Sequence, residues 1–461
     1  MNKLKIIIIT SILIIFSNNF AKAQENSVVI SKSDYENLIL RIENLEKNKK
    51  SEEKDSISNN RKNRIKENLT LGGYGEAVGH RYFYSNNFNR YSYPENFTDS
   101  KSRGEFDLPH VVFVAGYKFK KGFEMYSEIE FEHGGNGSSI ELEENEFGEF
   151  ESDIEKGGEV NIEQFWIQKS FCNALNIRVG HVIVPIGLTN NHHLPTEYFS
   201  VLRQEEETTI FPSTWHETGI SLWGKFDHWK YEVQFLSGLN AEMFNDANWI
   251  KKGSVSPYEF TISNSYAGSF RVDNTSVKGL RVGLSGYYGF SAANSLKVER
   301  YSGLHGGVTI GTFDFTYNDN NFLVYGNFDY GHLSDSKEIS KINKNLPKNS
   351  PSPRTNIASD AMSYAIFAGY DVFSFFKTLK NKDLKLYIFG HYGYTNSMFK
   401  TADGILADNK YKKNIISAGI NFYPIKEVAV KIEYGNRYFP NTKYNHENTI
   451  SVGIVYSAFF I

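Results

Sequence analysis

The stretch TISVGIVYSAFFI, residues 449–461, points to the fold class because its apolar residues recur at every second position. One face carries Ile450, Val452, Ile454, Tyr456, Ala458 and Phe460, and the other carries Ser451, Gly453 and Ser457. A β-strand places successive side chains on opposite faces, so this pattern predicts a strand with one apolar and one small or polar face.

The same two-residue period recurs upstream, in residues 428–434, 416–422 and 123–132. In the last of these the polar face holds four glutamates, namely Glu124, Glu128, Glu130 and Glu132. An apolar face opposite an ionisable face, repeated along the chain, is typical of a barrel with lipid outside and water inside. A soluble sandwich also alternates, but it seldom places Tyr and Phe at the ends of so many apolar faces, where a bilayer interface favours them.

Counting such segments gives sixteen predicted strands. They lie near residues 68–82, 103–119, 121–134, 158–171, 174–184, 215–226, 229–238, 258–272, 278–289, 303–317, 320–333, 360–373, 384–396, 410–423, 426–438 and 448–461. Their connections alternate between long and short, and the long ones are 83–102, 135–157, 185–214, 239–257, 290–302, 334–359, 397–409 and 439–447. The sequence therefore predicts an all-β fold, a 16-stranded antiparallel transmembrane β-barrel with both termini periplasmic and an aqueous lumen.

Composition agrees with this prediction and excludes several alternatives. The 461 residues carry 50 Lys and Arg against 53 Asp and Glu, a net charge of −3, so nothing favours a nucleic-acid partner. Aromatic residues make up 15% of the chain and Gly contributes 37 residues. The mean hydropathy of −0.43 excludes a helical multi-span protein. One cysteine, Cys172, excludes an intrachain disulfide framework and a Cys-rich metal site.

The N-terminus has the features of an export signal. Lys3 and Lys5 precede the apolar residues 6–16, and Ala21-Lys22-Ala23 supplies a small-x-small cleavage site. We therefore expect residues 1–23 to be a secretory signal peptide and the mature chain to begin at Gln24 in the bacterial outer membrane pathway. No cysteine follows the cleavage point, so lipid attachment there is not expected.

Between the signal and the barrel lies a short polar segment. In residues 24–48 the seam positions of a coiled-coil helix are Tyr35, Leu38, Ile42 and Leu45. Two heptads leave two interpretations open, a periplasmic oligomerisation helix or a frayed helix or disordered tail. Residues 49–67 form a polar linker, and the barrel domain spans 68–461.

The middle of the chain resembles a known family. The stretches that carry the resemblance are RVGHVIVPIGL at 178–188, then Pro195, Phe199 and Arg203, and FPSTWHETG at 211–219. They resemble the phosphate-selective porin O and P family, in the branch found in Bacteroidota. The resemblance implies a trimeric sixteen-stranded porin that passes small hydrophilic solutes, with phosphate preferred by some members.

Charged side chains at the narrowest ring set the selectivity of a wide pore. We expect the third long loop, 185–214, either to fold into the lumen or to remain outside as ordinary surface. Its constriction candidates are Arg203, Glu205, Glu206 and Glu207. The predicted pore-lining residues carry both signs and are Glu124, Glu128, Glu130, Glu132, Arg178, Glu217, Lys225, Arg281, Lys431, Glu433 and Arg437. The acidic loop 141–155 is interpreted as a solvated, cation-attracting rim or as a site for divalent cations that bridge lipopolysaccharide.

The sequence shows no catalytic constellation and no cofactor motif. His192-His193 lacks a third ligand at a diagnostic spacing, so no metal is expected. The predicted function is a porin for passive diffusion of ions and small hydrophilic solutes, including anions such as phosphate, and not an enzyme. The expected partners are outer-membrane lipid, lipopolysaccharide, the permeating solutes and two further copies in a homotrimer. The alternative is a closed barrel that serves as an adhesin or assembly scaffold through its long loops.

Overall fold

The computed structural model describes Arg41 and residues 67–133, 138–144, 150–156, 159–256, 260–295, 297–348, 350–380, 382–440 and 442–460. It divides the chain into two compact units, Met1–Glu67 and Asn68–Ile461. The predicted signal peptide, the polar linker as far as residue 66 and the coiled-coil positions Tyr35, Leu38, Ile42 and Leu45 lie outside the described residues.

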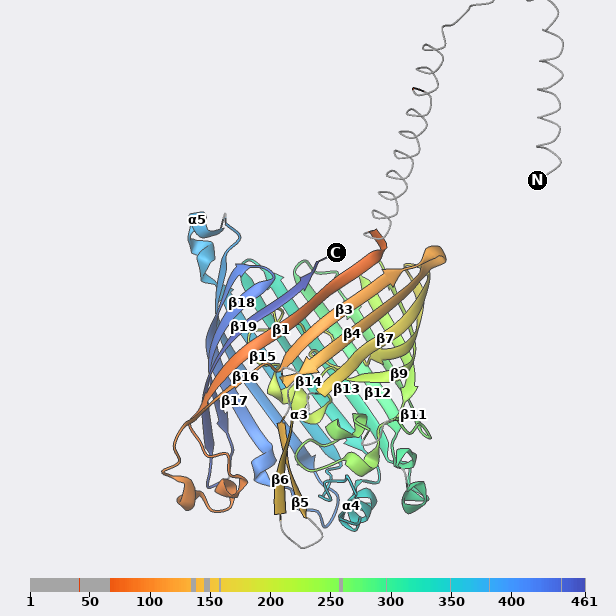
Figure 1. The fold of residues 1–461 in the computed structure, drawn as a ribbon, viewed down its shortest axis with the longest axis vertical. Coiled ribbons are helices and arrows are strands. Elements are labelled where there is room, and N and C mark those ends of the chain that lie inside the picture. The colour runs from red at the N-terminus through yellow and green to blue at the C-terminus, as the bar shows by residue number, and fades with distance from the viewer. Residues whose placement is uncertain are drawn as a thin grey trace, which may run out of the picture. The chain divides into compact units, whose positions relative to one another are not determined.

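The second unit is a closed antiparallel β-barrel (Figure 1). Its strands are β1 (Leu69–Tyr82), β2 (Arg103–Asp107), β3 (His110–Lys118), β4 (Phe123–Glu132), β7 (Glu159–Cys172), β8 (Leu175–Ile183), β9 (His216–Phe226), β10 (Trp229–Ser237), β11 (Tyr266–Asn274), β12 (Leu280–Phe290), β13 (Gly307–Asp319), β14 (Phe322–Leu333), β15 (Asp360–Asp371), β16 (Lys385–Lys400), β17 (Lys412–Ile425), β18 (Val428–Tyr438) and β19 (His446–Phe459). The ring closes where β19 pairs with β1, for example at Gly75 and Tyr456.

The number of barrel strands is the predicted sixteen. The sheet contains 17 strands, but β2 and β3 both pair with the same edge of β1 and count as one. The break between them falls at Pro109, which has no N–H to donate to the ladder. The predicted strand 103–119 is therefore interrupted, and its register shifts by one residue across the break, from Asp107 opposite Val78 to Val111 opposite Gly75.

The alternation of long and short connections is also confirmed, with two local corrections. The acidic segment expected as a loop at 141–155 instead contributes to a two-stranded hairpin, β5 (Ser138–Glu144) with β6 (Phe150–Lys156). The strand expected from residue 258 begins only at Tyr266. The reason is that Asn294 Oδ1 accepts the backbone N–H groups of Asn264 and Ser265 at 2.8 and 2.7 Å, which keeps these residues within the loop.

Within the described residues 69–460, helices are short and occur only outside the barrel strands. The α-helices are α3 (Glu205–Ile210), α4 (Ser336–Lys344) and α5 (Lys377–Lys380). The 3-10 turns are η1 (Phe88–Tyr91), η2 (Pro94–Phe97), η3 (Lys120–Gly122), η5 (Ala241–Met243), η6 (Lys251–Ser254), η7 (Ala292–Asn294), η8 (Val298–Tyr301), η9 (Val372–Phe375) and η10 (Asn409–Tyr411). Within the described part of the chain, no helix has both the length and the apolarity needed to cross a membrane.

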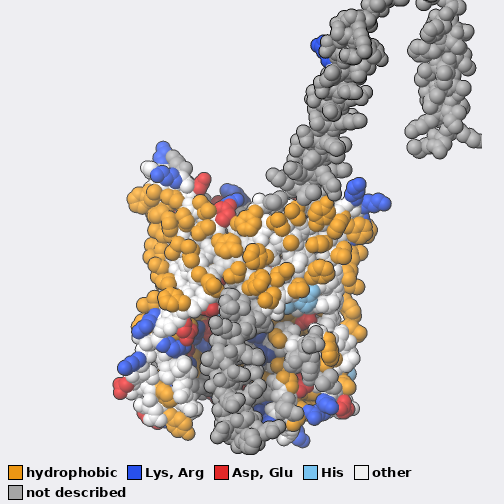
Figure 2. All heavy atoms as spheres, viewed as in Figure 1, with side chains coloured by type: hydrophobic (Ala, Val, Ile, Leu, Met, Phe, Trp, Pro, Cys, Tyr) orange, Lys and Arg blue, Asp and Glu red, His pale blue; other side chains and the backbone are white. Residues whose placement is uncertain are grey.

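The outer surface of the barrel is apolar. Figure 2 shows hydrophobic side chains gathered in a broad band over the barrel strands. The predicted apolar face of the last strand belongs to this surface, since Ile450, Val452 and Ile454 are exposed. In a closed sheet every backbone N–H and C=O group of the strands can form its hydrogen bond within the sheet, and the apolar outer surface can then face lipid. The barrel is therefore a transmembrane one.

The interior is polar, in contrast to the core of a soluble protein. Glu128, Glu130, Asp314 and Lys431 are all at most 2% exposed although each bears an ionisable group. Apolar clustering occurs instead where loops fold over the lumen, around Trp249 and the residues that precede β9. The predicted arrangement of lipid-facing and lumen-facing positions is thus observed, and it places the ionisable residues where a channel needs them.

Candidate functional site

The inner loop, residues 184–215, connects β8 to β9 and crosses the lumen. Lys431 Nζ on β18 donates hydrogen bonds to the carbonyl oxygens of Tyr198 and Ser200, at 2.8 and 2.9 Å. Asn421 Nδ2 on β17 donates to the carbonyl oxygen of Phe199 at 2.8 Å. Because β17 and β18 lie about half the circumference away from β8 and β9, the loop spans the interior of the barrel and does not remain outside it.

An aromatic contact fixes the middle of the inner loop. Phe199 is fully buried, and its ring stacks on Phe389 with ring centroids 5.1 Å apart and an interplanar angle of 5°. Its backbone N–H donates to the Tyr325 hydroxyl at 2.7 Å, and its ring lies where a Cβ on Gly369 would collide with it. Backbone and side chain of one residue therefore both bind the wall of the barrel.

Helix α3, at the end of the inner loop, presents three glutamates in different environments. Glu205 bridges two cations of the wall, since Lys413 Nζ lies 2.5 Å from its Oε1 and Arg437 Nε contacts its Oε2. Burial by itself raises the pKa of Glu205, but the charges of Arg437 and Lys413 outweigh it and hold that pKa well below its usual range. Glu205 is therefore a permanent anion within the lumen.

Glu206 is fully buried, and its Oε1 lies 3.0 Å from Nε2 of His391 on β16. It packs against Gly393, where any side chain would occupy the space of its carboxylate. Neither carboxylate oxygen has a well-formed hydrogen bond among the described residues. Glu206 thus lies in the interior with His391 as its ion-pairing neighbour among the described residues.

Glu207 ties the inner loop to itself. Its carboxylate accepts the backbone N–H groups of Leu188 and Thr189, both at 2.9 Å. This contact needs Gly187, which has a φ of +74° and approaches the Glu207 carboxylate too closely for a Cβ. Burial, followed by the neighbouring charge of Asp329, raises the pKa of Glu207, in the opposite direction to Glu205.

We expect the Glu205 bridge to remain ionised at pH 4. A carboxyl group whose pKa is lowered on folding stabilises the folded state at every pH above its unfolded pKa of about 4.3. This stabilisation is lost only as the pH falls through the lower pKa of the folded state. The difference in ion selectivity between the wild type and Glu205→Gln should therefore be the same at pH 7 and pH 4, as measured by reversal potential. A difference that disappears with a midpoint near pH 4.3 would contradict this expectation.

Arg203 projects from the inner loop towards the acidic part of the wall. Its Nη1 donates to Nε2 of His110 at 3.2 Å, and His110 Nδ1 lies 2.5 Å from Glu76 Oε1. Tyr198 also donates its hydroxyl to Glu76, at 3.2 Å. Among the described residues no carboxylate comes within ion-pairing distance of the Arg203 guanidinium.

All the predicted pore-lining residues occupy the alternate positions of their strands that face the lumen. They are Glu124, Glu128, Glu130 and Glu132 on β4, Arg178 on β8, Glu217 and Lys225 on β9, Arg281 on β12, and Lys431, Glu433 and Arg437 on β18. Several are engaged in fixed contacts. Arg281 Nη1 lies 2.6 Å from Asp314, which also binds Arg271, and Glu433 accepts the backbone N–H of Val201 at 2.9 Å.

The lumenal charges are segregated around the wall. Acidic groups gather on β1, β4 and β7, where Glu76, Glu128 and Glu163 are buried. Basic groups gather on β17 and β18, where Lys413 and Arg437 hold Glu205. A lumen with acidic and basic groups on different strands of the wall exposes a passing ion or dipole to an uneven field, which is least screened where the inner loop narrows the space.

The structure adds residues that the sequence analysis did not single out. Lys413, His391 and Asn421 bind the inner loop, and Arg271 forms a buried ion-pair cluster with Asp314. All four lie at lumenal positions of predicted strands, so the two-residue period could have found them as lining residues. Their contacts could not have been found, because each partner lies on an element distant in the sequence.

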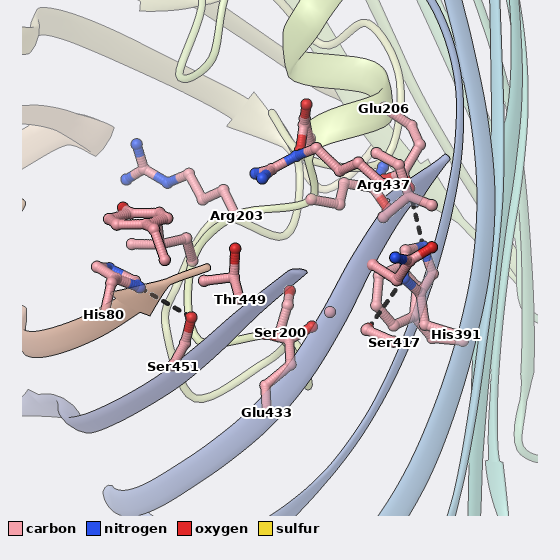
Figure 3. A pocket seen from close by; sticks show the side chains of 18 residues that line it. His80, Ser200, Arg203, Glu206, His391, Ser417, Glu433, Arg437, Thr449 and Ser451 are labelled. Carbon is pink, nitrogen blue, oxygen red and sulfur yellow. Dashed lines mark hydrogen bonds and ion pairs between the residues drawn. The ribbon is translucent and has the colours of Figure 1, made fainter. Parts of the chain in front are cut away.

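A polar pocket of about 120 Å³ lies between the inner loop and strands β1 and β15–β19 (Figure 3). Its lining includes His80, Ser200, Arg203, Glu206, His391 and Arg437. Three of these residues come from the inner loop and three from the wall, so the pocket exists only because the loop crosses the lumen. It brings together three of the four constriction candidates, Arg203, Glu205 and Glu206, with Arg437 of the wall.

Comparison with known proteins identifies the fold. No protein-family model matches the chain. An uncharacterized protein of Aquifex aeolicus is 25% identical over 390 residues, which cover 83% of this chain and 78% of that protein. Among solved structures, the high-pH form of Pseudomonas putida OprB is 10% identical, covers 87% of this chain and 96% of that one, and has a TM-score of 0.51. The outer membrane channel DcaP of Acinetobacter baumannii is 13% identical, covers 85% and 97%, and has a TM-score of 0.48.

Together, the closed sixteen-stranded ring and the likeness to OprB define the class: the chain has the fold of a porin. At these identities the likeness concerns the fold alone. The particular solute and the assembly therefore have to be inferred from the residues of this chain.

Proposed function

We propose that the protein is an outer-membrane porin, a water-filled channel for the passive diffusion of ions and small hydrophilic solutes, phosphate among them. One observation carries the proposal: an ionised lumen containing both signs of charge is narrowed by a loop that is bound to the opposite wall. An apolar core, not buried glutamates and arginines, would fill a barrel that served only as a scaffold.

The proposal includes the location and assembly. The apolar outer belt supports insertion in a membrane, and the predicted signal peptide at 1–23 directs the chain through the outer membrane pathway with periplasmic termini. The predicted helix at 24–48 and linker at 49–67 lie on the periplasmic side and support a homotrimer. Lipid and lipopolysaccharide surround the barrel domain, 68–461.

A channel is also favoured over an enzyme. Among the described residues no group of three or more His, Cys, Asp or Glu side chains could hold a metal ion. One ionisable cluster of the lumen pairs its charges internally, since Arg271 and Arg281 both bind Asp273 and Asp314, which suits a passive wall better than a reacting group.

Planar-bilayer conductance of the purified protein under a salt gradient tests the proposal. We expect stable ion-conducting steps that occur in groups of three, and a reversal potential of modest size because both signs of charge line the lumen. The folded state is checked beforehand by heat-modifiable migration on a gel. A folded barrel that conducts no ions would overturn the proposal and favour the adhesin or scaffold alternative.

A further inference from the structure

Unsatisfied polar atoms concentrate in the polar pocket. Within the described residues, six of its lining side chains contain a buried nitrogen or oxygen that forms no hydrogen bond: Ser200, Arg203, Gln204, Glu206, His391 and Thr449. Each such atom costs free energy unless a solute or water binds it, and most buried polar atoms in proteins are paired. The pocket therefore gathers several buried donors and acceptors without hydrogen bonds at one place in the channel.

The available groups include full charges of both signs. Arg203 forms no ion pair with the described residues, and its Nε–H is buried and unbonded. Glu206 is fully buried and has only the imidazole of His391 within ion-pairing distance. Figure 3 shows Arg203 on one side of the pocket and Glu206 with His391 on the other. These two side chains, neither of which forms a hydrogen-bonded ion pair among the described residues, are thus separated across the cavity.

The other charges of the pocket are balanced by their neighbours. Arg437 contacts Glu205, which it shares with Lys413, and Glu433 accepts a backbone N–H from the inner loop. A solute with only a negative charge would meet the carboxylates of Glu206 and Glu433, and a solute with only a positive charge would meet Arg203 and Arg437. A solute that carries both charges can satisfy both sides at once.

We propose that the polar pocket binds small zwitterionic solutes of the amino acid or dipeptide class during their passage. The solute carboxylate faces Arg203, whose planar guanidinium suits carboxylate geometry, and the ammonium group faces Glu206. In surroundings of low dielectric the field of Glu206 extends into the cavity and attracts the ammonium group. The hydroxyls of Ser200 and Thr449 complete the polar lining. This inference rests on the proposed porin function and specifies a solute class for it.

The test compares three solutes of similar size in the planar-bilayer assay, namely glycylglycine, N-acetylglycine and glycylglycine amide. At neutral pH the first carries both charges, the second only the carboxylate and the third only the ammonium group. We expect glycylglycine to reduce the ion current at about tenfold lower concentration than either of the other two. Equal effects of all three solutes, or no effect of glycylglycine on a conducting channel, would overturn the inference and leave the porin function intact.

Variants then locate the effect. Arg203→Gln and Glu206→Gln should each raise the half-blocking concentration of glycylglycine about tenfold, whereas Glu338→Gln, on the exposed face of α4, should leave it unchanged. Thr449→Val removes a hydroxyl without altering charge and should raise the half-blocking concentration of glycylglycine about threefold. This variant keeps the test decisive if a charge variant fails to fold. The inference is overturned if glycylglycine blocks Thr449→Val and every folded charge variant as strongly as the wild type. A folded wild-type barrel that carries no current overturns the porin function itself.

Discussion

Phe199→Ala should release the inner loop from the wall and raise the single-channel conductance severalfold. Phe199 is fully buried against Tyr325 and Phe389, and truncating a buried Phe typically costs about 3–5 kcal/mol. The loop has no strand ladder to absorb such a loss, whereas the barrel keeps all its backbone pairing. The expected consequence is an open loop within an intact barrel.

Two measurements distinguish this outcome from general destabilisation. Single-channel conductance reports the width of the lumen, and heat-modifiable migration reports the integrity of the barrel. Phe113→Ala is the matched control, because Phe113 on β3 is 56% exposed on the outer surface and contacts lipid instead of the loop. An unchanged conductance in a folded Phe199→Ala barrel would show that the loop does not limit the current.

Glu205→Gln should shift the selectivity of the channel towards anions. Glu205 compensates both Lys413 and Arg437, so its neutralisation leaves Lys413 without an ion pair and Arg437 with only Glu447, at 3.9 Å, beside the narrowed lumen. Charges at a constriction act on permeating ions at short range, and we expect the ratio of anion to cation permeability to rise about threefold or more at 0.1 M salt. Screening should reduce the effect at 1 M salt.

The reversal potential under a tenfold salt gradient measures this shift. Glu427→Gln is the matched control, since Glu427 lies in the short turn between β17 and β18 beside Lys426, away from the inner loop. A reversal potential that is the same in Glu205→Gln and wild type would contradict the placement of Glu205 along the ion path. Partial loosening of the loop is detected separately, because it would raise the conductance as in Phe199→Ala.

The barrel was predictable to within a few residues at nearly every strand. In the strand at 428–438 the alternation of Val430 and Ile432 with Lys431 and Glu433 already separates the lipid face from the lumen face. The exceptions are informative. Pro109 interrupts a strand that the two-residue period predicted to be continuous. Asn294 holds Asn264 and Ser265 in a loop, although the sequence predicted them to belong to a strand.

The site was predictable only as a set of candidates. Arg203, Glu205, Glu206 and Glu207 lie within five residues of the sequence and are all ionisable, yet the structure gives them four different surroundings. What separates them is the partner of each side chain. His110, Lys413 and His391 are remote in the sequence, and nothing in the loop itself indicates which residue each glutamate meets.

The sequence by itself determined the barrel: its strand number, the direction of its connections and the face on which each strand residue lies. These properties follow from a local period of two residues and from the difference between lipid and water, which act on every strand separately. Only the tertiary structure decided the course of the inner loop, the pairing of Glu205 with Lys413 and Arg437, and the pocket that Arg203 and Glu206 line. These depend on contacts across the lumen, between residues that come together only when the ring has closed.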